Sequence, residues 1–417
     1  MEAENQNNAP NPSIDQIIYA WNYISWGGAQ MYFLGLIKEA SKYFKITVLM
    51  PEGSDEQLVS FFREEGVECV FFAPSFDPKG GSGLFARMRL HYDKMVSEAA
   101  MLSALREKFD LERSIVHVEL APWQSLLSLI RLLARSRVFV TMHNSLPRVN
   151  PVRRMLWTVK LRLVSGFQRF NAFASNKDAK RFFKGYFSTR MHDRILVTYT
   201  NVNPLEIDAA FEEEVDAPQL KRHYDLPEDR FLIFCVGQFI DRKGRWTFLE
   251  AARTLCVKRR DLHFVWISNT VISNADEDRI RSYEIDDRFS LIDSDELGPE
   301  HIDLFKFVRL ADVFALPSLL EGLPISLLEA MALGIPSIST RVNAIPEAIH
   351  DGETGLLVEP GDAEGLAAAI EKLVADKELR TKFATQGRAR VLSEFNEIKV
   401  AKIAVDAYFR ATYGAQE

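Results

Sequence analysis

The chain has 417 residues, of which 47% are hydrophobic and 26% charged, and its net charge is −7. This length exceeds what one hydrophobic core usually organises, so we expect two domains of an ordinary globular protein. No apolar run approaches the ~18 residues needed to span a bilayer. The polar first 12 residues lack the apolar core of a signal peptide, so we expect a cytoplasmic protein.

Charge is distributed unevenly along the chain. Residues 81–190 contain 20 lysines and arginines against 7 aspartates and glutamates, so the remainder is strongly acidic. This asymmetry predicts an anionic partner for one face. The three cysteines lie far apart in apolar runs without the spacing of metal ligands, and we expect buried thiols in a reducing compartment.

The first half alternates short apolar runs with helical patterns. After a tail at residues 1–13 that we expect to be disordered, helices are predicted at 27–43 and 54–65. Strands are predicted at 16–20, 46–50, 67–72, 114–118, 138–141, 172–174 and 195–198. Parallel βαβ units of this kind indicate a doubly wound domain over residues 14–203.

The alternation restarts after the acidic segment 204–228, which we interpret as an irregular linker. A helix is predicted at 245–258, and strands are predicted at 231–236, 263–267, 312–316 and 336–339. The fold class is therefore α/β, with a second doubly wound, Rossmann-like domain over residues 204–397. Residues 398–413 again have helical periodicity.

Two glutamates, Glu321 and Glu329, are separated by seven residues around a strand–loop–helix unit. Pro324 suits the first turn of the helix, where its missing N–H would have no partner. Gly334 suits a left-handed cap after the helix.

This unit predicts an anion site. The free N–H groups of Gly322, Leu323 and Ile325 would point to the crevice at the carboxyl end of the strand, where a phosphate fits. An acid on each side of a phosphate site indicates a nucleotide-sugar pocket.

The pattern resembles the E-x7-E signature of the large retaining glycosyltransferase family 4, which has the GT-B fold. The segment 237–244 looks like that family's strand–turn that grips the donor diphosphate. The segments 27–30 and 351–358 look like its Gly-Gly loop and its D-G-x-x-G-x-L-V turn. The resemblance is nearly continuous over residues 231–375 and weak over the first half. It implies two Rossmann-like domains facing a central cleft, with the last helix packing back on the first domain.

The resemblance also implies roles for the charged residues. Glu321 would face the transferring sugar, and Glu329 would face the ribose. Arg242 and Lys243 lie where cations oppose a helix dipole, so a bound diphosphate would account for them. Gln238 stands where the family usually has an arginine, a contact that Arg242 can replace from a neighbouring position.

Two candidates lie in the first domain. The family has a histidine near the reacting carbon, where this chain has His143 after a predicted strand. The alternative for His143 is an ordinary hydrogen-bonded loop residue. Gly27 and Gly28 permit close approach of a ligand or simply a tight turn. The remaining histidines are interpreted as structural: His91, His117, His192, His223, His263, His301 and His350.

A D-x-D sequence at Asp293 and Asp295 is typical of metal sites in the other large glycosyltransferase fold. We interpret it as a turn at a strand end, because Arg242, Lys243 and helix N-termini already meet the charge of a diphosphate. We therefore expect no metal, and no cofactor other than the nucleotide diphosphate-sugar as co-substrate.

The leading hypothesis is a retaining glycosyltransferase that acts on an acceptor hydroxyl in glycan, glycolipid or polysaccharide synthesis. One alternative is a GT-B-fold nucleotide-sugar epimerase or a phosphorylase, although no motif for a pyridoxal phosphate lysine is visible. Another is a catalytically inactive, transferase-like binding protein.

Residues 151–167 place apolar side chains at helical spacing, with basic residues largely on other faces. The apolar positions are Val152, Met155, Leu156, Val159 and Leu163. Such a helix can lie on an anionic bilayer, or its stripe can pack on the core. We expect a lipid-linked or otherwise anionic acceptor and a peripheral position on the inner face of the membrane. Nucleic acid is not expected, because no recognition motif accompanies the charge.

Overall fold

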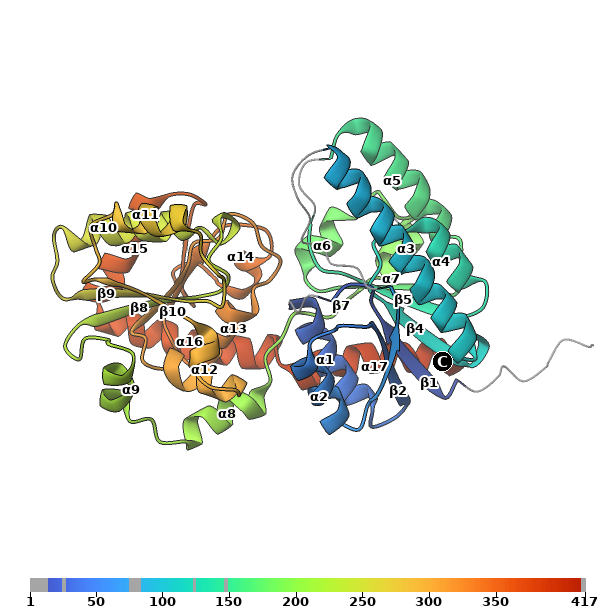
Figure 1. The fold of residues 1–417 in the computed structure, drawn as a ribbon, viewed down its shortest axis with the longest axis horizontal. Helices are drawn as coiled ribbons and strands as arrows, with labels where there is room; N and C mark the ends of the chain where they lie inside the picture. Colours follow the sequence, from blue (N-terminus) through green and yellow to red (C-terminus); the bar gives the residue numbers. More distant parts are fainter. Residues whose placement is uncertain (1–13, 25–27, 75–83, 123–124, 146–148, 414–417) are drawn as a thin grey trace, which may run out of the picture. The chain divides into compact units, whose positions relative to one another are not determined.

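The computed structural model describes residues 14–24, 28–74, 84–122, 125–145 and 149–413. Contacts divide the chain into two units. The first comprises Met1–Ser175, Ala179–Thr198 and Val400–Glu417, and the second comprises Asn176–Asp178 and Tyr199–Lys399. Each unit has one parallel sheet with helices on both faces (Figure 1). The predicted α/β class with two Rossmann-like domains is confirmed.

The sheet of the first unit has the order β3-β2-β1-β4-β5-β6-β7. Its strands are β1 (Gln16–Ala20), β2 (Lys45–Pro51), β3 (Glu68–Phe72), β4 (Ser114–Val118), β5 (Arg137–Met142), β6 (Phe170–Ala174) and β7 (Leu196–Val197). The central strand β1 pairs with both β2 and β4. Crossovers leave β1 in both directions, so the sheet is doubly wound.

Helices bury both faces of this sheet. They are α1 (Gly28–Ala40), α2 (Glu56–Glu64), α3 (Leu84–Lys108), α4 (Leu126–Leu133), α5 (Pro151–Val164), α6 (Lys177–Phe182), α7 (Thr189–Arg194) and α17 (Glu397–Tyr413). Side chains alternate along a strand, so Ile17 and Tyr19 pack with α1, α2 and α17. Ile18 and Ala20 pack in the opposite core with α3, α4 and α5.

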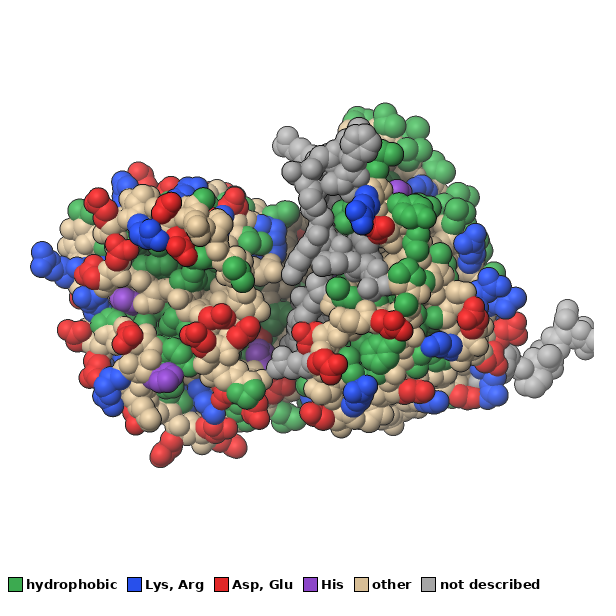
Figure 2. Space-filling view, viewed as in Figure 1, with side chains coloured by type: hydrophobic (Ala, Val, Ile, Leu, Met, Phe, Trp, Pro, Cys, Tyr) green, Lys and Arg blue, Asp and Glu red, His purple; other side chains and the backbone are tan. Residues whose placement is uncertain are grey.

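Helix α5 presents an exposed apolar stripe. Its N-cap Asn150 accepts a hydrogen bond from the Arg153 N–H, and Leu161 and Val164 are its buried residues. The five stripe residues at positions 152, 155, 156, 159 and 163 are between 50% and 65% exposed. Figure 2 shows hydrophobic side chains gathered over the part of the first unit where α3 and α5 lie. The alternative in which the stripe packs on the core is therefore wrong.

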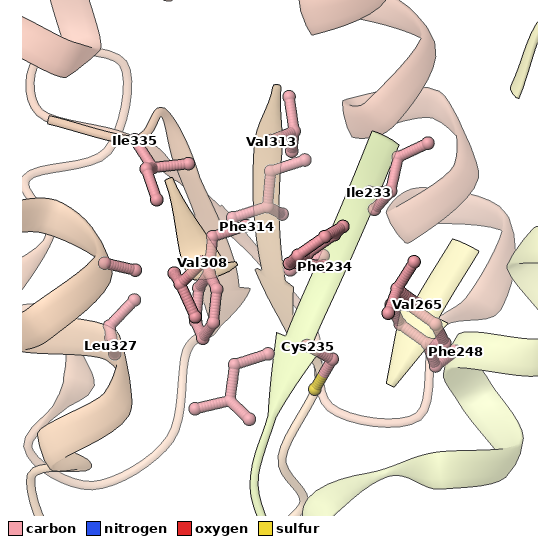
Figure 3. Close-up of a cluster of buried hydrophobic side chains, with 14 of the residues drawn as sticks. Ile233, Phe234, Cys235, Phe248, Val265, Val308, Val313, Phe314, Leu327 and Ile335 are labelled. Carbon is pink, nitrogen blue, oxygen red and sulfur yellow. The ribbon is translucent and has the colours of Figure 1, made fainter. Parts of the chain in front are cut away.

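The sheet of the second unit has the order β10-β9-β8-β11-β12-β13. Its strands are β8 (Phe231–Val236), β9 (Leu262–Ile267), β10 (Phe289–Ile292), β11 (Val313–Leu316), β12 (Ser337–Thr340) and β13 (Leu356–Val358). Phe234 of β8 pairs in register with Phe314 of β11. In Figure 3, side chains of these central strands lie beside Phe248 and Leu327, which come from the flanking helices. All of them belong to one hydrophobic core.

The helices of this unit are α8 (Pro204–Glu212), α9 (Ala217–His223), α10 (Arg245–Cys256), α11 (Asn274–Arg281), α12 (His301–Val308), α13 (Ile325–Ala332), α14 (Ile345–Ala348), α15 (Ala363–Ala375) and α16 (Lys377–Glu394). Two of them correct the interpretation of residues 204–228 as irregular. Asn203 and Asp216 cap α8 and α9, and each helix has a proline in its first turn. Within the described residues, no helix is long and apolar enough to cross a bilayer.

Candidate functional site

The candidate site of the second unit lies where the sheet order reverses. Strands β8 and β11 are neighbours, but their chains continue to opposite edges of the sheet, toward β9 and β12. The loops that leave the carboxyl ends of such strands diverge and open a crevice, which is where doubly wound sheets bind ligands. Here these loops carry the 3₁₀ turn Asp241–Lys243 after β8 and residues 317–324 after β11.

Glu321 is the centre of an ion cluster between these two loops. Its carboxylate lies 2.6 Å from Lys243 Nζ through Oε1 and 3.2 Å from Arg242 Nη1 through Oε2. Ser318 Oγ donates a further hydrogen bond to Oε1 at 3.0 Å. The Glu321 side chain is 7% exposed and that of Lys243 is 12% exposed, whereas Arg242 is open to solvent. The structure thus brings together three of the four residues predicted to be catalytic.

Backbone geometry holds the two loops against each other. The Leu319 N–H donates to the Arg242 carbonyl at 2.8 Å. Gly244 has φ +77°, and a Cβ atom there would lie 1.9 Å from the Pro317 carbonyl oxygen. A side chain at Gly244 would push the loops apart, so glycine is required directly after Lys243.

The start of helix α13 supplies unpaired backbone donors. Pro324 is the N-cap residue, one position before the helix rather than inside its first turn as predicted. In the described parts of the chain, no acceptor receives the N–H groups of Gly322, Leu323 or Ile325. Together with Arg242 and Lys243, these donors form an electropositive end to the crevice. Gly334 has φ +74°, as its predicted cap position requires.

Glu329 lies on α13 and contacts a histidine that the sequence analysis interpreted as structural. His301 Nε2 is 3.2 Å from Glu329 Oε1, and His301 Nδ1 is 3.2 Å from Glu206 Oε2. Burial alone would lower the pKa of His301, but the two glutamates raise it to about 10. His301 is therefore a cation at neutral pH, held between the two carboxylates.

No sequence signal near His301 reveals this contact. Glu206 belongs to helix α8, in the segment interpreted as an irregular linker, and His301 begins helix α12. Recognising the Asn-Pro start of α8 would have placed Glu206 on a helix, although not beside His301.

Two other polar candidates of the second unit are accounted for locally. The Gln238 side chain is exposed, and the backbone carbonyl of Gln238 accepts a hydrogen bond from the Ile240 N–H. The Asp293 carboxylate accepts from the Asp295 N–H and caps a 3₁₀ turn directly after β10. The described residues include no group of three or more histidine, cysteine or acidic side chains suited to a metal ion.

The remaining candidates belong to the first unit. His143 follows β5, and its Nε2 lies 3.3 Å from Glu119 Oε2. Gly28 is the first residue of α1, and Gly27 lies outside the described residues. The predicted tail at 1–13 lies outside them as well.

Residues 216–390 match the family model described as "Glycosyl transferases group 1". This segment carries the whole ion cluster and Glu329. Among curated proteins, the chain is 32% identical over 186 residues to the lipopolysaccharide core biosynthesis glycosyltransferase LpsE of Rhizobium meliloti (45% of this chain, 51% of LpsE). The chain spans about half the length of the curated relatives it matches.

Two solved structures are similar over nearly the whole chain. A glycosyltransferase from Rickettsia africae has a TM-score of 0.73 at 17% identity, covering 96% of this chain and 99% of its own. Anabaena HepE, solved in complex with UDP and glucose, has a TM-score of 0.72 at 14% identity, covering 95% and 99%. The fold is that of the GT-B glycosyltransferases.

Proposed function

We propose that the protein is a retaining glycosyltransferase that moves a sugar from a nucleotide diphosphate-sugar to an acceptor hydroxyl in glycan, glycolipid or polysaccharide synthesis. The observation that carries the proposal is the cluster of Lys243, Arg242 and Glu321, together with the backbone N–H groups at the start of α13 that have no acceptor among the described residues. It combines donors for a diphosphate with a carboxylate for sugar hydroxyls. The relationship of residues 216–390 to glycosyltransferases supports the same chemistry.

In this proposal the cations act on the leaving group. As the bond between sugar and diphosphate breaks, negative charge grows on the phosphate, where Lys243, Arg242 and the backbone donors stabilise it. Glu321 orients the sugar and Glu329 accepts from the ribose hydroxyls. Retention follows if the acceptor attacks the face that the diphosphate leaves, with a phosphate oxygen taking the acceptor's proton.

The first unit would complete the reaction. His143 is proposed to contact the donor sugar near the reacting carbon, and Gly27 and Gly28 to allow close approach of the donor. In the second unit, Gln238 lies two residues after β8, where its side-chain amide can contribute a hydrogen bond to the donor.

Metal-independence is part of the proposal, because Lys243 and Arg242 supply the positive charge that a divalent ion would otherwise bring. Transfer should survive EDTA, and the Asp293→Asn, Asp295→Asn double variant should remain active. Complete loss with the chelator, restored by manganese or magnesium, would contradict it.

Purified full-length protein tests the function directly. Thermal unfolding should be screened with UDP, GDP, ADP and their common sugars, since a ligand at 100 times its Kd adds about 2.7 kcal/mol of apparent stability. The donor that stabilises is then assayed for transfer to glycan acceptors and for slow hydrolysis, with the anomeric configuration of the product read by NMR. A stabilising donor that is neither transferred nor hydrolysed would identify an inactive binding protein instead. Conversion of the donor's sugar to its epimer, without transfer, would identify an epimerase.

The acceptor is proposed to be lipid-linked or otherwise anionic and presented at the inner face of the membrane. The support is helix α5, whose exposed apolar stripe is accompanied by Arg153, Arg154, Lys160 and Arg162. Helix α3 adds exposed Met88, Tyr92 and Met95. Apolar area with adjacent basic residues is what a helix lying on an anionic bilayer requires.

A further inference from the structure

The first unit contains a cavity of about 710 Å³ that none of the proposed chemistry uses. It lies at the amino ends of β5 and β6, beneath the last turns of α17. Arg137 and Phe139 of β5 both line it, because side chains two positions apart lie on the same face of a strand. Phe173 of β6 lines it as well. Ala407 and Ala411 of α17 leave the space open.

Four arginines from four separate segments surround this cavity. They are Arg137 at the start of β5, Arg169 just before β6, Arg194 at the end of α7 and Arg410 near the end of α17. The lining residues include no aspartate or glutamate. Across the described ranges, none of the four guanidinium groups has a carboxylate within ion-pair distance.

The polar contacts of these arginines leave their charge uncompensated. Arg194 Nη2 donates to Asn171 Oδ1 at 3.0 Å, and Arg169 Nη1 donates to the Ala134 carbonyl at 3.4 Å. Burial and the neighbouring charge of Arg169 lower the pKa of Arg137. Arginine nevertheless remains protonated in proteins. Arg169, Arg194 and Arg410 are exposed, so water and salt screen their repulsion, and a bound anion would relieve it further.

The ligand class follows from the chemistry of the guanidinium group. Its planar fork matches two oxygens of a phosphate, and arginine is the preferred residue for that recognition. The volume is within the range of small-molecule sites, which is far more than one chloride ion needs. We propose that this cavity is a binding site for a phosphate compound with at least two negative charges.

This site is separate from the donor site. Ligands of doubly wound sheets bind at the carboxyl ends of the strands, whereas this cavity lies at the amino ends of β5 and β6. All its lining residues belong to the first unit, and Arg242 and Lys243 belong to the second.

Calorimetric titration of the full chain with inorganic pyrophosphate tests the assignment. The Arg137→Gln, Arg410→Gln double variant should bind at least tenfold more weakly at this site. The matched control Arg106→Gln, Arg131→Gln removes the same charge from exposed helix positions outside the cavity and should bind like the wild type. Lys243→Ala should also retain this binding event, which separates it from any binding at the donor site.

Two results would overturn the proposal: no pyrophosphate binding by the wild type, or equal binding by the Arg137→Gln, Arg410→Gln variant. If that variant fails to fold, the Arg137→Lys, Arg410→Lys variant retains the charge but loses the forks, and should still weaken binding. Co-sedimentation with phosphatidylcholine vesicles, with and without phosphatidic acid, distinguishes the source. If the Arg137→Gln, Arg410→Gln variant loses pyrophosphate binding but still binds vesicles with phosphatidic acid, the ligand is a free phosphate compound. If the variant loses both kinds of binding, the ligand is a lipid headgroup.

Discussion

Glu321 forms ion pairs with both cations of the candidate donor site. Its carboxylate contacts both Lys243 and Arg242 while being 7% exposed. Removing such charges from water costs more free energy than a surface ion pair contributes, so the stability of the fold alone explains this cluster poorly. A bound diphosphate would compete for the same cations and free the Glu321 carboxylate for the hydroxyls of the sugar.

The first prediction concerns Lys243. Its replacement by alanine should lower kcat/KM for the donor about 100-fold, the scale for losing one electrostatic donor to a transition state. The control is Lys372→Ala, which removes an exposed lysine from α15 of the same unit. Steady-state transfer assays measure both. Equal activity of the two variants would contradict the role of Lys243.

The second prediction separates the two glutamates. Glu321→Ala should reduce turnover more than nucleotide binding, because its carboxylate is proposed to act on the sugar. Glu329→Ala should weaken nucleotide binding, measured by calorimetry with the free nucleotide, because its partner is proposed to be the ribose. The reverse pattern would mean that the two roles are exchanged.

The third prediction concerns His301, which we expect to be a positioning residue for Glu329. His301→Gln removes a cation that binds Glu329 at 3.2 Å, and should weaken nucleotide binding about tenfold. Because the pKa of His301 is raised from 6.5 to about 10, its ion pairs stabilise the fold fully below pH 6.5. That contribution is lost as pH rises through 10.

Urea unfolding of wild type and His301→Gln across pH 6 to 10 measures this dependence. The difference in free energy of unfolding should be largest at pH 6 and shrink toward pH 10. A difference that is constant with pH would show that His301 contributes packing and no charge. His223→Gln is the control, since no ion pair to His223 occurs within the described residues.

At the scale of elements, the contact between the two site loops depends on Gly244. Gly244→Ala places a methyl group against Pro317, whereas Gly352→Ala has a similar φ of +74° and nothing within 4 Å. The fourth prediction is that Gly244→Ala loses about 1–3 kcal/mol more stability than Gly352→Ala, because only the former is overpacked. Denaturant unfolding measures the free energy of unfolding of both variants. Equal decreases would mean that backbone strain, and not overpacking against Pro317, causes the whole effect.

Elements with a strong local signal were predictable from the sequence. The runs 16–20, 114–118 and 231–236 are strands at those positions, because parallel strands buried on both faces are continuously apolar. Strands β10 and β13 were not predicted, and the residues of β13 were assigned instead to the turn at 351–358. Helices α8 and α9 were missed because acidic composition was given more weight than their caps.

Only those residues of the candidate site that lie in short sequence motifs could be predicted. Glu321, Glu329, Arg242 and Lys243 occur in short motifs that the strand–loop–helix pattern explains. The ion pairs of His301 join residues 28 and 95 positions apart, and the arginines of the cavity come from four segments. Such contacts arise from tertiary packing, for which no spacing rule exists.

At the scale of the whole molecule, the basic surplus of residues 81–190 includes part of the cavity and the basic residues of α5. The fifth prediction is that the protein binds vesicles containing phosphatidylglycerol but not those of phosphatidylcholine alone. The Met155→Glu, Val159→Glu double variant should lose this binding, because it places acids on the exposed stripe of α5. Raising salt should weaken the binding, since each basic residue near an anionic surface contributes about 1 kcal/mol that ions screen.

The control variant for this measurement is Val257→Glu, Val271→Glu, which adds the same charge at two highly exposed apolar positions of the second unit. Its vesicle binding should match that of the wild type, because the change lies outside the α5 stripe. Equal loss in both variants would make the effect one of net charge. If vesicle binding does not depend on lipid charge and salt concentration, or if no vesicles are bound, the α5 stripe has no membrane partner. A soluble acceptor would then be favoured.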